Sequence, residues 1–130
     1  MNYIRDSKGK KNTKLGEYLD IALSKLPNFR GISFRGTYLT NYEISKYQQA
    51  LDDKIIITEY SFTSSSRVKN QADQYRKTAM FEIFSKKGKL IEKGSKFVKE
   101  QEILFRKDSQ FHVLGIEKHD SYVYITLREI

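Results

Sequence analysis

The sequence has no cysteine and no tryptophan, and only two histidines among its 130 residues. Without cysteine there is no disulfide, no thiol nucleophile and no thiolate ligand for a metal. His112 and His119 are too few for a histidine-rich zinc centre, so we expect no metal. No apolar run approaches the roughly 18 residues of a membrane-spanning helix, and no signal-peptide core stands near the start. We therefore expect a soluble chain that does not enter a membrane.

Acidic residues are also scarce relative to basic ones: 16 Asp and Glu stand against 24 Lys and Arg, which gives a formal charge of +8. This balance favours an anionic partner, such as nucleic acid, an acidic protein, a membrane surface or a phosphate-bearing small molecule. Lysines gather near the start, where a flexible segment in solvent is a more common interpretation than a dedicated binding patch. We interpret residues 1–11 as a flexible basic segment and residues 12–130 as a single domain.

Helical patterns come first in the chain, and short strands follow. Apolar residues recur at helical spacing over residues 12–27, and residues 40–53 begin with a capping box of Thr40 and Glu43. Residues 67–77 fit a short helix, and a turn at 86–89 is expected to close the strand before it. The segments that we predict as strands are 31–39, 54–66, 78–85, 101–105, 111–117 and 122–129. This order predicts an α+β fold, a compact β-sandwich of mainly antiparallel strands with N-terminal helices.

Two glutamates, Glu100 and Glu102, flank Gln101 just before the apolar run Ile-Leu-Phe. In a strand, side chains two residues apart share a face and lie roughly 6.6 Å apart along the chain. Such a carboxylate pair suits cleavage of a glycosidic-type bond, in which one carboxylate stabilises an oxocarbenium-like centre and the other handles a proton. Charges that protect an exposed sheet edge give the same pattern, and on the pair alone this second interpretation is favoured.

Two further short motifs lie earlier in the chain. Arg35 stands at a strand end before Gly36, and its guanidinium is suited to hold phosphate oxygens with two hydrogen bonds. Ser64, Ser65 and Ser66 end an apolar strand, where their hydroxyls are suited to bind a ribose, an amide or a carboxylate. Ser66 is equally suited to cap the helix that follows.

The order and spacing of these motifs resemble the mono-ADP-ribosyltransferase family, in particular its arginine–serine–glutamate branch of bacterial toxins. The resemblance is carried by "FRGT", "FTSSS", "GKLIEKGSKFVKEQEILF" and the closing strands around "FHVLGIEKHDSYVYITL". It extends from the first predicted helix to the end of the sequence. It implies an ADP-ribosyltransferase-like catalytic domain that uses NAD+ as co-substrate. No dinucleotide-binding glycine motif and no phosphate-loop lysine motif is present, so side chains must hold the pyrophosphate.

The resemblance also implies roles for individual residues. Arg35, beside Gly36, matches the arginine that binds the NAD+ phosphates, and Ser64 matches the serine that lines the nicotinamide pocket and holds the glutamate. Ser65 stands where the family usually has threonine, and Ser66 matches the last serine of the motif. Glu102 matches the catalytic glutamate, which favours the oxocarbenium-like transition state.

Two further residues bear on the acceptor. Glu100 matches the glutamate that orients or deprotonates the acceptor guanidinium in arginine-modifying members. Phe97 stands where an aromatic side chain contacts the target, although a core or hinge position suits it equally.

We therefore predict an NAD+-dependent mono-ADP-ribosyltransferase that modifies a target protein on arginine, as a toxin or effector domain. The same residues would serve an NAD+ glycohydrolase, in which water is the acceptor. A basic module that binds nucleic acid is the alternative from another class, supported by the charge and by 8 Phe and 9 Tyr. It lacks a recognisable RNA-binding strand and leaves the glutamates unexplained. We expect a monomer that is secreted or delivered into a target cell and acts in its cytoplasm.

Overall fold

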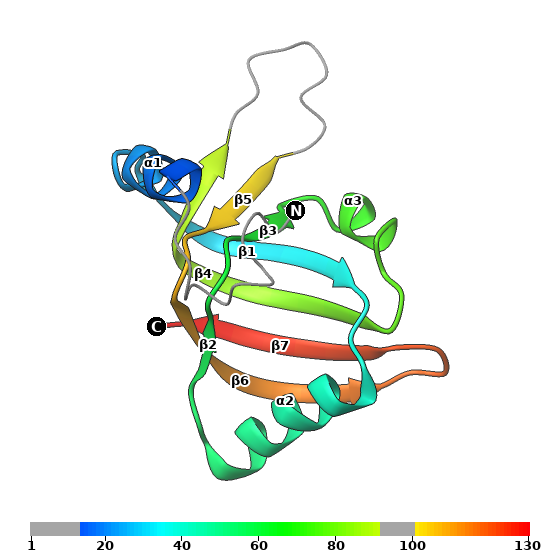
Figure 1. The fold of residues 1–130 in the computed structure, drawn as a ribbon. Helices are drawn as coiled ribbons and strands as arrows, with labels where there is room; N and C mark the ends of the chain where they lie inside the picture. Colours follow the sequence, from blue (N-terminus) through cyan, green and yellow to red (C-terminus); the bar gives the residue numbers. More distant parts are fainter. Residues whose placement is uncertain (1–13, 92–100) are drawn as a thin grey trace.

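The computed structural model describes residues 14–91 and 101–130. Figure 1 shows their helices and strands. The helices are α1 (Lys14–Ser24), α2 (Asn41–Asp53) and α3 (Lys69–Asp73). The strands are β1 (Asn28–Thr37), β2 (Ile57–Glu59), β3 (Thr63–Ser66), β4 (Ala79–Ile91), β5 (Glu102–Phe105), β6 (Ser109–Lys118) and β7 (Val123–Glu129). No helix in these two stretches is long and apolar enough to cross a membrane.

Helix α2 begins where the sequence predicted. The Thr40 hydroxyl accepts a hydrogen bond from the Glu43 backbone N–H at 3.1 Å, and the Glu43 carboxylate accepts one from the Thr40 N–H at 3.0 Å. This reciprocal capping box satisfies N–H groups that the first turn leaves without partners. At the other end Lys54 takes a left-handed conformation, with φ of 56°, and its N–H bonds to the Ala50 carbonyl. Local sequence therefore determines both ends of this helix.

The strands form one bent sheet in the order β1-β3-β5-β4-β7-β6-β2, with a further pairing between β1 and β4. The 13-residue strand β4 pairs with β1 from Ala79 to Lys89 and with β5 from Lys89 to Ile91. The strands β1, β3, β5 and β4 consequently close into a small barrel. All pairs are antiparallel except β4 with β7. The expected α+β fold with mainly antiparallel strands is confirmed.

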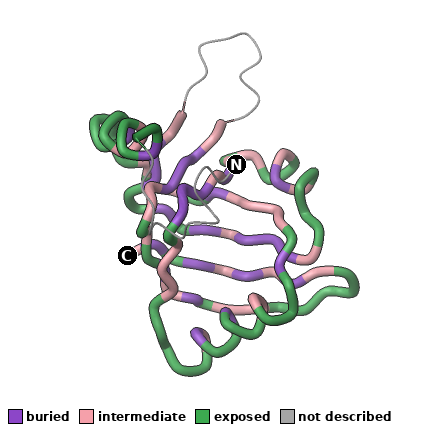
Figure 2. Tube along the Cα trace, in the orientation of Figure 1, coloured by how far each residue is buried: buried purple, intermediate pink, exposed green. Residues whose placement is uncertain are grey.

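Two apolar clusters hold the helices against this sheet. The larger one includes Tyr47 and Ala50 of α2, which pack with Phe81 and Ile83 of β4 and with other sheet residues. Figure 1 shows α2 running along β6, on the side of the sheet where this cluster lies. The smaller cluster joins Leu23 of α1 to Phe62 and Leu104. Figure 2 shows the buried residues concentrated along the central strands, while most of α1 is exposed.

The turn predicted at residues 86–89 is wrong, because β4 continues through it to Ile91. The pairing of β4 with β1 shifts here, and the Glu129 carboxylate accepts hydrogen bonds from the N–H groups of Lys86 and Lys87 at 2.7 and 2.6 Å. These bonds satisfy the backbone groups that the irregular pairing leaves without strand partners. Gly88 is buried there, and an added Cβ would lie 2.6 Å from the Ser85 hydroxyl oxygen. The glycine thus permits close packing inside a strand.

Candidate active site

The centre of the candidate site is a hydrogen bond between two neighbouring strands. In the antiparallel pairing of β3 with β5, Ser66 lies opposite Glu102 and Ser64 lies opposite Leu104. Since Glu102 and Leu104 are two residues apart, the side chains of Ser64 and Glu102 share one face of the strand pair. The Ser64 hydroxyl donates a hydrogen bond to Glu102 Oε2 at 2.5 Å. The bond fixes the orientation of the carboxylate at the start of β5.

Arg35 reaches this pair from β1. Its Nη1 donates a hydrogen bond to the backbone carbonyl of Ser64 at 3.0 Å. The contact brings a guanidinium to the residue that holds the carboxylate, although Arg35 and Ser64 are 29 positions apart. The structure thus links Arg35 to the Ser64 backbone and Ser64 to Glu102, and the roles of the three residues at NAD+ stay predictions.

Ser65 points to the opposite face, because successive side chains of a strand alternate. Its hydroxyl oxygen lies 2.8 Å from the Ser33 hydroxyl oxygen and 2.9 Å from the Ile103 carbonyl oxygen. Ser65 is 6% exposed and Ser33 is fully buried. Both serines therefore lie inside the barrel, beneath the Ser64–Glu102 pair. A direct contact of Ser65 with a cofactor stays a prediction.

Ser66 and Gly36 shape the segment around α3. The Ser66 hydroxyl accepts a hydrogen bond from the Val68 N–H at 3.0 Å, whereas the residue at the N-cap of α3 is Val68 itself. An added Cβ at Gly36 would lie 2.2 Å from the Ala72 carbonyl oxygen and 2.5 Å from the Arg76 nitrogen. Only a glycine allows the end of α3 to approach β1 so closely. Their predicted contacts with a cofactor stay predictions.

Glu102 is held by a neutral group. No ion pair joins it to a basic side chain within residues 14–91 and 101–130. A hydroxyl partner brings no opposite charge to a carboxylate, whereas a neighbouring guanidinium compensates its field. The predicted residues Glu100 and Phe97 lie outside the described residues.

A second carboxylate on this side of the sheet was not singled out from the sequence. Glu82 of β4 lies opposite Phe34 of β1, which in turn lies opposite Ser66. The Tyr124 hydroxyl donates a hydrogen bond to Glu82 Oε1 at 2.5 Å. Burial raises the pKa of Tyr124 well above its ordinary value, and the bond to Glu82 adds to the shift. The signal available in the sequence was that Glu82 is a single acidic residue in an otherwise largely apolar predicted strand.

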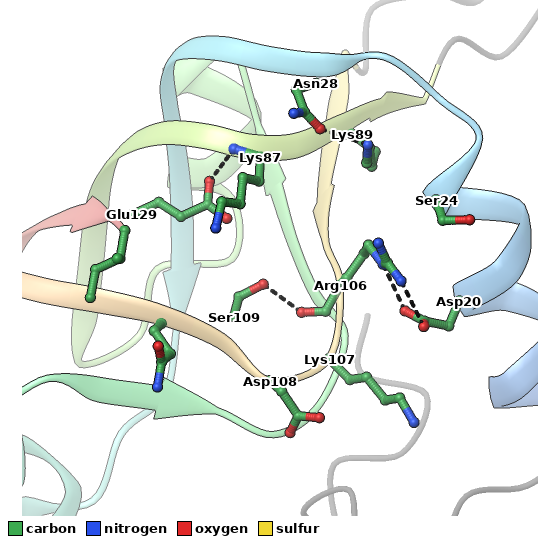
Figure 3. A pocket seen from close by; sticks show the side chains of 12 residues that line it. Asp20, Ser24, Asn28, Lys87, Lys89, Arg106, Lys107, Asp108, Ser109 and Glu129 are labelled. Atoms are coloured by element: carbon green, nitrogen blue, oxygen red, sulfur yellow. Dashed lines mark hydrogen bonds and ion pairs between the residues drawn. The ribbon is translucent and has the colours of Figure 1, made fainter.

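The hollow at the other end of β5 is a separate feature. It has a volume of about 620 Å³ and lies between α1, the turn after β5 and the end of β7. Figure 3 shows Arg106 and Asp20 pointing toward each other at one side of the hollow. Arg106 binds both carboxylate oxygens of Asp20 at 2.8 Å, and Glu129 accepts hydrogen bonds from the backbone of β4.

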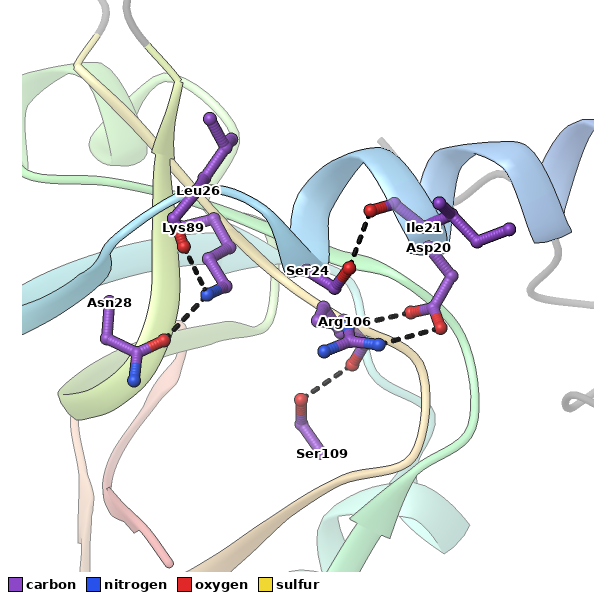
Figure 4. Close-up of polar contacts among 8 residues, drawn as sticks. All are labelled: Asp20, Ile21, Ser24, Leu26, Asn28, Lys89, Arg106 and Ser109. Carbon is purple, nitrogen blue, oxygen red and sulfur yellow. Dashed lines mark hydrogen bonds and ion pairs between the residues drawn. The ribbon is translucent and has the colours of Figure 1, made fainter.

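Lys89 also lines the hollow, and its buried position is explained by its hydrogen bonds near the end of helix α1. Its Nζ donates hydrogen bonds to the Leu26 carbonyl and to Asn28 Oδ1, each at 2.7 Å (Figure 4). Leu26 lies just beyond the C-terminus of α1, where a cation is favoured by the helix dipole. The polar groups of the hollow therefore fasten α1 to the barrel. Within residues 14–91 and 101–130 no group of His, Asp or Glu side chains is arranged to hold a metal ion.

The family of NAD:arginine ADP-ribosyltransferases matches residues 9–130. The chain belongs to this family. Among curated proteins, it is similar to Vis of Vibrio splendidus (strain 12B01), with 28% identity over 120 residues, and to Mav of Mycobacterium avium (strain 104), with 34% identity over 99 residues. Both relatives are named as NAD(+)–arginine ADP-ribosyltransferases. These alignments cover 84% and 75% of this chain.

Solved ADP-ribosyltransferase structures share the fold. The type III effector XopAI of Xanthomonas axonopodis pv. citri superposes with a TM-score of 0.69 and 29% identity, over 84% of this chain and 46% of its own. The chain spans about half the length of the relative Vis, 47%, and 12% of Mav. It therefore corresponds to one part of these longer ADP-ribosyltransferases.

Proposed function

We propose that this ADP-ribosyltransferase domain transfers ADP-ribose from NAD+ to arginine on a target protein. The observation that carries the proposal is the hydrogen bond from Ser64 to Glu102, beside the guanidinium of Arg35. The resemblance to the arginine–serine–glutamate branch implies that an arginine, a serine and a glutamate, in this order along the chain, form the NAD+ site.

In the proposed reaction the bond between ribose C1′ and the nicotinamide nitrogen breaks. The electron pair leaves with neutral nicotinamide, and positive charge develops on the ribose. A carboxylate fixed in advance toward that position stabilises the charge without having to reorganise. Glu102 meets this requirement because Ser64 holds one of its oxygens and no described cation neutralises it. A guanidinium nitrogen of the acceptor then attacks C1′ and forms the new C–N bond, and its proton passes to a base, a role for which we propose Glu100.

Arg35 is suited to the pyrophosphate of NAD+. A guanidinium matches the geometry of phosphate oxygens and stays charged at every accessible pH. Its bond to the Ser64 carbonyl sets it beside the residue that orients Glu102. NAD+ would thus be bound at its phosphates by β1 and cleaved at its ribose by β5. Exoenzyme S of Pseudomonas aeruginosa, which shares the fold at a TM-score of 0.75, has been solved bound to Carba-NAD.

The acceptor assignment rests on the family and on the glutamate at position 100. Vis, solved in complex with agmatine, superposes with a TM-score of 0.72. Agmatine carries the guanidinium of arginine without its carboxylate, so it is the natural small acceptor for a first assay. We further propose a role as a toxin or effector domain that modifies a protein inside a target cell, since XopAI is a type III effector.

The test is to incubate the purified chain with NAD+ and to measure free nicotinamide, with and without agmatine. Release that depends on agmatine, together with ADP-ribosyl-agmatine in the mass spectrum, supports the proposal. Release without any acceptor, unchanged by agmatine or by cell lysate, means NAD+ glycohydrolysis instead. Glu102→Gln is the control, because it keeps the shape of the side chain and removes the charge.

A further inference from the structure

Two buried serine hydroxyls lie directly beneath the Ser64–Glu102 pair. Ser33 of β1 is fully buried, Ser65 of β3 is 6% exposed, and their hydroxyl oxygens are 2.8 Å apart. Ser65 also lies 2.9 Å from the Ile103 carbonyl oxygen of β5. Paired hydroxyls at a position where apolar side chains would pack equally well call for an explanation, because a buried hydroxyl is costly unless it is bonded.

The direction of the two hydrogen bonds follows from proton counting. A serine hydroxyl has one proton to donate, and a carbonyl oxygen only accepts. Ser65 must therefore donate to the Ile103 carbonyl and accept from Ser33 if both contacts are hydrogen bonds. The result is a directed chain from Ser33 through Ser65 to Ile103. It joins β1, β3 and β5 inside the barrel.

This inner chain controls the position of the outer pair. Ser65 and Ile103 lie opposite each other, and each directly follows a residue of the pair, Ser64 and Glu102. Because neighbouring side chains of a strand are rigidly related, a shift of Ile103 against Ser65 moves Glu102 against Ser64. Ser33 adds β1 to this arrangement, two residues before Arg35. The hydrogen bonds from Ser33 through Ser65 to Ile103 thus link the three strands of the site, β1, β3 and β5.

We propose that Ser33 is a positioning residue, which acts through Ser65 to hold Glu102 against Ser64. The proposal rests on the proposed function for its kinetic consequence. In this proposal Ser33 does not touch substrate and acts only through its bond to Ser65. Their effect should fall on kcat, because Arg35 keeps its own bond to Ser64 when the inner chain is removed.

Single and double substitutions have different consequences. Ser65→Ala leaves the buried Ser33 hydroxyl without a partner and also frees Ile103, so it should lower both stability and kcat. Ser33→Ala leaves the bond from Ser65 to Ile103 in place, so it should have the smaller effect. The double variant removes both hydroxyls, so neither is left buried without a partner. Its stability should therefore recover toward the wild-type value, while its kcat stays low. A merely structural role would make kcat recover with stability.

Ser85 of β4 provides the matched control. It is also a buried serine in the barrel wall, 8% exposed, and its hydroxyl lies 3.0 Å from the Phe29 carbonyl oxygen and 3.2 Å from the Gly88 nitrogen. These two hydrogen bonds lie within β1 and β4, and neither of them goes to β3 or β5. Ser85→Ala should lower stability without lowering kcat.

The experiment measures nicotinamide release with agmatine, denaturant unfolding and amide hydrogen exchange for Ser33→Ala, Ser65→Ala, the double variant and Ser85→Ala. We expect kcat to fall about threefold for Ser33→Ala and about tenfold for Ser65→Ala and the double variant, because small misplacements of a catalytic group are costly. KM for NAD+ should change less than about twofold. Ser65→Thr, which keeps the hydroxyl, should retain kcat within about twofold.

Full recovery of kcat in the double variant, or an equal loss in Ser85→Ala, would overturn the proposal. If the wild-type chain releases no nicotinamide, the proposed function fails, and hydrogen exchange still decides on Ser33. Faster exchange of the backbone amides in β3 and β5 for Ser33→Ala than for Ser85→Ala then supports the link. Unchanged amide exchange in these two strands would contradict the proposed role of Ser33.

Discussion

The carboxylates that lie near the two ends of β5 have different kinds of partner. At the start, Glu102 is bonded to the neutral hydroxyl of Ser64 at 2.5 Å. Just beyond the end of β5, the Arg106 guanidinium donates hydrogen bonds to both carboxylate oxygens of Asp20 at 2.8 Å. One strand of four residues thus separates a carboxylate bonded to a neutral hydroxyl from one that is paired with a guanidinium.

This difference separates catalysis from stability. An ion pair with a guanidinium lowers the free energy of the charged carboxylate and fixes α1 to the barrel, but it leaves little charge for a ligand. A hydroxyl orients a carboxylate without cancelling its charge, which is what a developing cation requires. We therefore expect substitutions at the start of β5 to act on turnover and those beyond its end to act on stability.

The largest effect is expected from exchanging the charge at the start of β5. Glu102→Gln should lower kcat for nicotinamide release by at least about a hundredfold, because the developing positive charge loses its stabilising carboxylate. Its free energy of unfolding should change by less than about 1 kcal/mol, since Ser64 retains an oxygen to bond to. Asp20→Asn, the matched change at the other end, should leave kcat within about twofold. A Glu102→Gln variant that keeps more than a tenth of the activity would contradict the comparison.

Removing the orienting hydroxyl should have the next largest effect. In Ser64→Ala the Glu102 carboxylate keeps its charge but loses its fixed direction, so kcat should fall about tenfold. Ser24→Ala removes a hydroxyl beside the hollow, where it bonds to the Ile21 carbonyl at 2.6 Å, and should leave kcat unchanged. Steady-state kinetics with NAD+ and agmatine compare the two. Equal losses in both variants would remove the special role of Ser64.

Features with a local signal were predictable from the sequence. The capping box of Thr40 and Glu43 lies within four residues, so its pattern predicts its hydrogen bonds directly. The strand segments were recognisable from their β-branched and aromatic residues. The proximity of Arg35, Ser64 and Glu102 was expected because the order of their three motifs resembles that of a known family.

Features that depend on distant partners were not predictable. The sequence "KKGK" resembles a turn, and the carboxylate that makes it a strand irregularity comes from Glu129, 43 and 42 residues away from the two N–H groups it accepts from. The fastening of α1 joins Asp20 to Arg106 across 86 residues. Ser33 and Ser65 are 32 residues apart, and nothing in "GISFRGT" marks the first of them as a partner of the second. Such contacts follow from strand pairing, which local patterns do not specify.

Lys89 of β4, which lies opposite Leu104 of β5 and lines the hollow, offers a test of stability alone. Lys89→Met should lower the free energy of unfolding by about 1–2 kcal/mol, because the Leu26 carbonyl and the Asn28 amide oxygen lose their donor. The loss is limited because the variant also avoids burying a charge. Urea unfolding measures it, and kcat per folded molecule should stay the same. A loss of turnover at full folding would show that α1 also serves the site.

The smallest effect is expected from Asp20→Asn, and it depends on pH. Hydrogen bonds from the Arg106 guanidinium hold the pKa of Asp20 below its ordinary value. Because the folded-state pKa is lowered, the stabilisation is fully present above the unfolded value of about 3.9 and is lost as pH falls through the folded value. The pair is partly exposed, with 38% of the Arg106 and 23% of the Asp20 side chain accessible, so it should contribute about 0.5–1 kcal/mol at neutral pH.

The stability difference between wild type and Asp20→Asn should accordingly be constant from about pH 5 to pH 8 and shrink below about pH 4. Urea unfolding at several pH values measures it. Glu102→Gln is the control from the other end of β5, since Glu102 makes no ion pair with a described basic side chain. A difference for Asp20→Asn that persists unchanged at pH 3 would mean that the two ends of β5 do not differ in how they use charge.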